Sequence, residues 1–78
     1  MLEKLLLVAE FDGRRFEIIQ DTIGFFVWAY IGQGPRTTHD YLQNDLEMAI
    51  RCAQNEFGVP TRSWRRAMPD EKPAYAIG

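Results

Sequence analysis

Few residues of this sequence carry side chains suited to catalysis. The chain has one histidine, His39, and one cysteine, Cys52. A histidine can act as a general base or pH switch, but His39 lies in a polar loop before a predicted helix, where solvent exposure is the simpler interpretation. Cys52 falls in mid-helix beside an apolar stripe, which favours packing over nucleophilic chemistry. One His and one Cys assemble neither a nucleophile–base pair nor a zinc site, so the sequence predicts no enzyme, no catalytic residue, no metal and no cofactor.

Two further patterns also have simple structural interpretations. The carboxylates of the predicted helix are spread around it, and the pair nearest to one edge, Asp45 and Glu56, lies about 16 Å apart along the axis at 1.5 Å per residue. That distance is too long for an acid/base pair. The segment Gly32-Gln33-Gly34-Pro35 lacks the lysine of a P-loop and the third glycine of a dinucleotide fingerprint, and we interpret it as a turn.

The most distinctive segment is Arg62-Ser63-Trp64-Arg65-Arg66. Arginines around a tryptophan can bind phosphates and stack a base. They can also contact an acidic protein surface, because Trp and Arg are favoured interface residues. A third interpretation is that Trp64 folds back onto the domain and leaves the arginines solvated. The net charge of −2 over 78 residues weakens the nucleic-acid interpretation.

The N-terminal half predicts a β-hairpin. Two apolar runs, 5–11 and 14–20, flank Asp12-Gly13, a dipeptide typical of type I′ turns. A two-residue turn predicts that Ala9 lies opposite Phe16, Leu7 opposite Ile18, and Leu5 opposite Gln20, all on one face. The other face then pairs Glu10 with Arg15, Val8 with Glu17, and Leu6 with Ile19.

A third strand is predicted over 25–31 (FFVWAYI), and two registers are open. A three-residue loop ending at Gly24 places Phe26, Trp28 and Tyr30 beside Phe16 and Ile18, and we favour it because Asp-x-x-Gly suits a type I turn with a bulge. A four-residue loop places the other row there instead, namely Phe25, Val27, Ala29 and Ile31. Either register leaves one apolar row on the opposite face.

The 3.6-residue period predicts a helix from Asp40 to Phe57, with Asp40 as N-cap and Gly58 as the left-handed residue after its end. Its apolar stripe comprises Leu42, Leu46, Ala49, Ile50, Ala53 and Phe57. Residues 61–68 suit a short final strand or an extended arm, and 69–78 a flexible tail. The predicted fold class is α+β: a three-stranded antiparallel meander packed by one helix (β-β-β-α), optionally with a short C-terminal fourth strand. It forms a single domain over 1–68.

Composition points to association. The chain is 46% hydrophobic, yet one helix covers only one face of a sheet. An exposed apolar face usually marks an interface, and a domain this small gains stability from a partner. The expected partner is a second copy, as a homodimer, or another protein; nucleic acid at 62–66 is the alternative. The candidate partner-binding residues are Leu6, Val8, Ile19, Phe25, Val27, Arg62, Trp64, Arg65 and Arg66. No run reaches the ~20 apolar residues of a membrane span, and a lone cysteine fits the reducing cytoplasm.

The hairpin at Asp12-Gly13, followed by Asp45-Leu46-Glu47-Met48-Ala49-Ile50 in the helix, resembles small bacterial proteins of the HicB-type antitoxin and polymorphic-toxin immunity kind. The resemblance spans about Leu5 to Phe57. It departs at Thr22-Ile23-Gly24, where that family usually carries a proline-rich turn, and no DNA-binding extension follows the helix. The resemblance implies inhibition by binding without catalysis, and it assigns no site residue.

Overall fold

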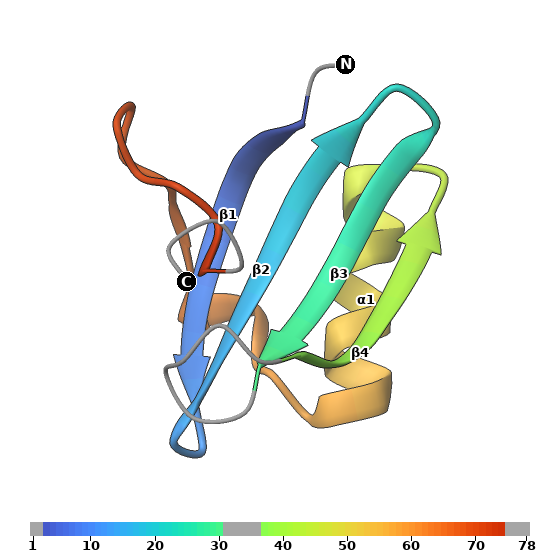
Figure 1. Ribbon diagram of the computed structural model, residues 1–78. Coiled ribbons are helices and arrows are strands. Elements are labelled where there is room, and N and C mark those ends of the chain that lie inside the picture. Colours follow the sequence, from blue (N-terminus) through green and yellow to red (C-terminus); the bar gives the residue numbers. More distant parts are fainter. Residues whose placement is uncertain (1–2, 31–36, 75–78) are drawn as a thin grey trace.

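The computed structural model describes residues 3–30 and 37–74, with the backbone alone for 37–40. Its elements are β1 (Lys4–Phe11), β2 (Arg14–Asp21), β3 (Gly24–Tyr30), β4 (Thr37–Gln43), α1 (Leu46–Phe57), the 3-10 turn η1 (Thr61–Ser63) and β5 (Trp64–Arg66). The strands form one antiparallel sheet in the order β4-β3-β2-β1-β5. The α+β class is confirmed. The sheet of the described residues has five strands and not three (Figure 1). Strand β5 is the short C-terminal strand that the sequence offered as one option for 61–68, and β4 was not predicted.

The first hairpin is confirmed. Asp12 and Gly13 adopt φ angles of 56° and 71°, the left-handed values that a type I′ turn requires. The predicted pairs hold from the turn as far as Leu7 opposite Ile18. An irregularity between Leu5 and Leu7 then shifts the register, so that Ile19 lies opposite Leu5 and not opposite Leu6 as predicted.

The favoured register of the second hairpin is wrong. Asp21 pairs with Gly24 around a two-residue turn, and the Asp21 carboxylate accepts hydrogen bonds from the Thr22 backbone N–H and hydroxyl. Val27 therefore lies opposite Ile18 and Ala29 opposite Phe16, which is the alternative register. These small inward side chains leave room for a helix to pack closely, which Trp28 and Tyr30 would not.

Gly24 is required where the second hairpin meets β4. Its φ is +152°, and a Cβ there would lie 2.6 Å from the backbone oxygen of Gln43. Only glycine lets the two chain segments approach so closely.

The helix starts later than predicted. Residues 37–43 pair with β3 as strand β4, so that His39 lies in a strand opposite Ala29 and not in a loop. The N-cap is Asp45 and not Asp40, and its side chain accepts a hydrogen bond from the Met48 backbone N–H at 2.8 Å. The predicted helix end is confirmed, because Gly58 has φ 75° and its N–H donates to the carbonyls of Ala53 and Gln54. The predicted turn at 32–35 lies outside the described residues.

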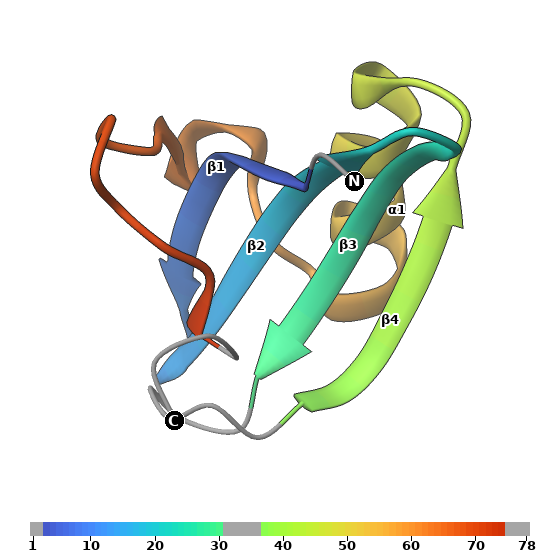
Figure 2. The same ribbon diagram turned by 45° about the horizontal axis from the view of Figure 1, so that its top comes forward.

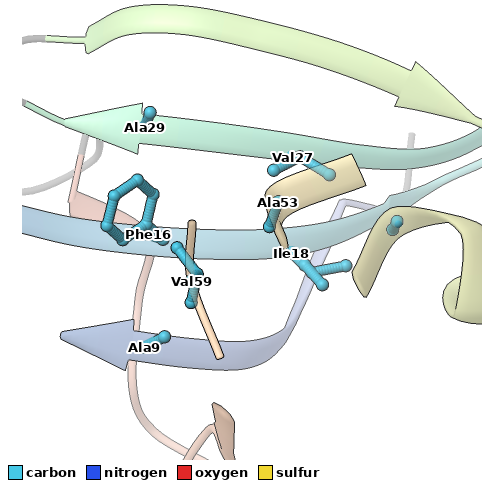
Figure 3. Packing of buried hydrophobic residues seen from close by; sticks show 8 residues of the cluster. Ala9, Phe16, Ile18, Val27, Ala29, Ala53 and Val59 are labelled. Carbon is cyan, nitrogen blue, oxygen red and sulfur yellow. The ribbon is translucent and has the colours of Figure 1, made fainter. Parts of the chain in front are cut away.

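Helix α1 packs on one face of the sheet, behind β3 and β4 (Figures 1 and 2). The core between them is small and apolar (Figure 3), and its buried members are Ala9, Phe16, Ile18, Val27, Ala29, Ala49, Ala53 and Val59. The two helix alanines are fully buried, so the helix lies close against the strands. We call this side of the sheet the helix face and the opposite side the outer face.

Candidate functional site

The arginine–tryptophan segment does not form one patch, because strand β5 alternates its side chains between the two faces. Trp64 lies opposite Ala9 and packs against the helix-face core. Its indole Nε1 is buried, with no hydrogen-bond partner among the described residues. Arg65 lies opposite Val8 on the outer face, and Arg66 lies opposite Leu7 on the helix face. Arg62 is exposed in η1. Trp64 is thus not displayed as a stacking platform beside three arginines.

A C-terminal strap, residues 67–74, crosses the outer face over β1 and β2 (Figures 1 and 2). It leaves β5 at Ala67, whose N–H donates to the Leu6 carbonyl at 2.9 Å. It ends at Ala74, which is buried and whose N–H donates to the Glu17 carboxylate at 2.9 Å. Residues 69–74, predicted as part of a flexible tail, are therefore held against the sheet. The rest of that predicted tail, 75–78, lies outside the described residues.

The strap is held by a network of charged and polar groups that we call the latch. Its centre is Glu17, which is completely buried. Glu17 accepts hydrogen bonds from the Tyr30 hydroxyl at 2.7 Å and from Arg15 Nε at 2.6 Å, besides the Ala74 amide. Arg15 also forms an ion pair with Glu71 at 3.4 Å. Arg65 donates hydrogen bonds to Glu71 from both terminal nitrogens, at 3.0 and 2.9 Å. Acids and arginines thus alternate along the latch, in the order Glu17, Arg15, Glu71 and Arg65.

The electrostatics of the latch favour the ionised state of Glu71. Hydrogen bonds from Arg65 and from the Met68 backbone N–H lower the pKa of Glu71 from 4.5 to about 2, and Arg15 adds to the effect. The hydrogen bonds between Arg65 and Glu71 also raise the pKa of Arg65. Glu71 is therefore ionised at neutral pH beside Arg65. The latch also gives the buried Glu17 carboxylate three hydrogen-bond donors, without which its burial would be costly.

The strap and helix cover much of the surface predicted to be open. Val8 and Ile19 lie on the outer face of the sheet, beneath the strap, and their exposed fractions are 0% and 1%. Val27 is buried on the helix face, and Phe25 packs against the same core. The prediction that these four side chains form one uncovered face is wrong. Its physical causes are the alternative register of β3 and the ordered strap.

The part of the outer face over β3 and β4 remains partly open. Phe26 lies opposite Leu42 across the two strands, and Trp28 follows on β3. The Phe26 and Trp28 rings pack with centroids 6.5 Å apart, and both side chains are partly exposed. Leu42 is 46% exposed although it sits within a strand. We call Phe26, Trp28 and Leu42 the open strip. It spans β3 and β4, and β4 is an edge strand of the sheet.

A second apolar region lies at the opposite edge of the sheet, between β1, the end of β5 and the start of α1. A groove of about 330 Å³ is lined by Lys4, Leu5, Leu6, Leu7, Leu46, Arg66 and Ala67. Two of the predicted partner-binding residues, Leu6 and Arg66, meet here. The remaining predicted residues of the arginine–tryptophan segment do not line it.

Catalytic groups are not brought together in the described part of the chain. Partial burial and the nearby Glu56 carboxylate raise the pKa of the Cys52 thiol, which leaves it less ionised than an ordinary thiol. No group of three His, Cys, Asp or Glu residues among the described side chains, 3–30 and 41–74, is placed to hold a metal ion. No helix in those ranges is long and apolar enough to span a membrane.

Sequence reasoning missed the latch, although one signal was present. Glu17 stands between Phe16 and Ile18 in a strand, and its cross-strand neighbours are Val8 and Trp28. A carboxylate with apolar residues on both sides of its row is expected to be buried, and buried charges are paired. Its hydrogen-bond partner on the strap, the Ala74 N–H, is 57 residues away in the chain, beyond the reach of any local pattern.

Comparison with known proteins does not add a family to this geometry. No protein-family model, no curated protein and no solved structure matches the chain.

Proposed function

We propose that this chain is a protein-interaction domain that acts by association, with a second copy or with another protein, through the open strip on β3 and β4. The observation that carries the proposal is the exposure of Leu42, an aliphatic side chain 46% exposed in a strand and directly opposite a partly exposed Phe26. Apolar side chains grouped at a sheet surface mark interaction sites more often than isolated ones do.

The surroundings of the strip support this proposal. The strip includes Leu42 of the edge strand β4, and the edge of a sheet offers backbone groups to another chain. A partner seated here covers both the apolar side chains and the edge. The resemblance to antitoxin and immunity proteins is compatible with this mode, since it implies inhibition by binding, and on this proposal no catalytic residue is needed.

The test compares two equally exposed side chains. Leu42 on the strip is 46% exposed, and Met48 on α1 is 44% exposed. We expect light scattering to give a mass above 9.1 kDa for the chain at high concentration or in the presence of its partner. Leu42→Glu returns the mass to 9.1 kDa, because it places a charge in an apolar contact. Met48→Glu, the matched control, leaves the assembly intact.

The proposal has a clear counter-result. It is overturned if the wild-type chain stays at 9.1 kDa at every concentration and a photo-crosslinking residue at position 42 gives no protein adduct in cells. Equal loss of assembly in the two variants also contradicts it, because the open strip is then not the contact.

A further inference from the structure

The groove at the β1 and β5 edge combines an aliphatic floor with a cationic rim. Leu6, Leu7 and Leu46 are all half-buried, so each retains surface that a ligand could cover. Lys4 and Arg66 are exposed at the same groove. We call this feature the leucine groove. It is separate from the open strip, which lies at the opposite edge of the sheet.

Two features of the fold create the leucine groove. Helix α1 contacts mainly β3 and β4, and only its first residue, Leu46, lines the groove beside β1 and β5. Consecutive residues of a regular strand point to opposite faces, yet both Leu6 and Leu7 line the groove. The irregularity between Leu5 and Leu7 explains this, because a bulge re-aims side chains. Leu46, the first residue of α1, forms the facing wall.

The rim cations differ from the arginines nearby in their ion pairs with described residues. Arg15 and Arg65 are paired with Glu17 and Glu71 in the latch, and Arg51 is paired with Glu47 at 3.2 Å. Within the described ranges, Lys4 and Arg66 form no ion pair. The groove therefore presents two uncompensated positive charges beside leucines, in a chain whose net charge is −2. A carboxylate brought to this rim gains attraction without breaking an existing pair.

We propose that the leucine groove binds an acidic segment of a partner protein, in which adjacent aliphatic side chains fill the floor and carboxylates that follow them reach Lys4 and Arg66. The chemistry of the groove favours a peptide over a nucleic acid. Its lining has leucines in place of the aromatic side chains on which bases stack, and the nearby Trp64 packs against the core.

The experiment uses the full chain and a short fluorescein-labelled peptide with two adjacent leucines followed by three glutamates. Fluorescence anisotropy should show saturable binding, weakened about fivefold or more when the glutamates are replaced by glutamines. Raising the salt from about 0.05 M to about 0.5 M should weaken it by a similar factor, because exposed charge pairs are screened. In NMR titrations, the backbone signals that shift should include Leu6, Leu7 and Leu46.

Paired charge reversals locate the contact. Arg66→Glu should weaken binding of the acidic peptide about five- to tenfold, and Lys4→Glu should act in the same direction. Lys72→Glu is the matched control: Lys72 is an exposed cation on the strap that does not line the groove, and its reversal should leave binding unchanged. All three positions are exposed, so circular dichroism should show unchanged folding.

Four results overturn this inference. Equal binding of the glutamate and glutamine peptides does so, as do equal effects of Arg66→Glu and Lys72→Glu. Tighter binding of single-stranded DNA than of the acidic peptide, with shifts in the same backbone signals, is the third. These three leave the proposed function intact. The fourth is loss of a homodimer in Arg66→Glu, which would make the leucine groove, and not the open strip, the contact between two copies. Conversely, failure of the Leu42 test has no bearing on the leucine groove.

Discussion

The two faces of the sheet are covered in different ways. The helix face is closed by apolar packing: Phe16, Ile18 and Val27 meet two alanines of α1, and the Phe16 and Phe57 rings lie with centroids 5.3 Å apart. The outer face is covered over β1 and β2 by a strap that ion pairs tie to the sheet, from Glu17 through Arg15 to Glu71, and whose Ala67 packs on a small apolar cluster. Neighbouring residues Phe16 and Glu17, both at most 1% exposed, belong to the two different systems.

This difference teaches that similar burial can arise from forces with different sensitivities. Apolar burial depends little on salt or moderate acid. An ionic network weakens when its acids are protonated and, where it is exposed, when salt screens it. The helix face should thus keep the domain folded under conditions in which the strap is released. Each experiment below separates the two faces.

The largest effect is expected for Phe16→Ala. Removing a fully buried aromatic side chain leaves a cavity between β2 and α1 and should lower the free energy of unfolding by about 3–5 kcal/mol. A core this small supplies roughly that much in total, so the variant should be largely unfolded. Chemical denaturation monitored by circular dichroism measures the loss. A well-folded variant would show that the helix face is not the main source of stability.

The next largest effect is expected for Glu17→Gln. The change removes the buried charge that Arg15, the Tyr30 hydroxyl and the Ala74 amide surround, and should lower the free energy of unfolding by about 2–4 kcal/mol. Hydrogen exchange at the Ala74 N–H should accelerate more than exchange in α1. If both regions accelerate equally, the two faces unfold as one unit and the comparison fails.

Acid should act on the strap through Glu71. The folded-state pKa of about 2 lies below the ordinary 4.5, so the stabilisation by Glu71 is fully present above about pH 4.5 and is lost as the pH falls through about 2. Glu71 is at the surface beside the half-exposed Arg65, so we expect about 1–2 kcal/mol. Glu71→Gln should remove this part of the pH dependence, measured by denaturation at a series of pH values. The neighbouring Asp70→Asn is the control and should leave it unchanged.

The smallest effect separates two adjacent arginines. Arg65→Ala removes the exposed end of the latch and should cost about 0.5–1 kcal/mol, less at high salt. Arg66→Ala should leave stability unchanged within about 0.5 kcal/mol, because Arg66 faces the leucine groove and forms no ion pair within the described ranges. Thermal unfolding at low and high salt checks both. Equal destabilisation would mean that the alternation of β5 does not divide the segment between two faces.

Local signals predicted the local features well. The turn at Asp12-Gly13 and the end of α1 at Gly58 both depend on residues close together in the chain. The helix start was harder, because Asp40 and Asp45 both suit an N-cap and the apolar residues of 41–42 fit a helical or a strand period. Pairing with β3 decided for a strand, and that is a tertiary contact.

By itself, the sequence determined an α+β domain with a first hairpin in near-correct register, one amphipathic helix, and more apolar surface than one helix can cover. Short-range turn chemistry and hydrophobic periodicity are enough for these conclusions. Only the tertiary structure decided which row of β3 faces the helix, that Trp64, Arg65 and Arg66 alternate between faces, and that Glu71 returns to Arg15 over the outer face. These outcomes depend on side-chain size beneath α1 and on ion pairs between distant residues, neither of which a local pattern encodes.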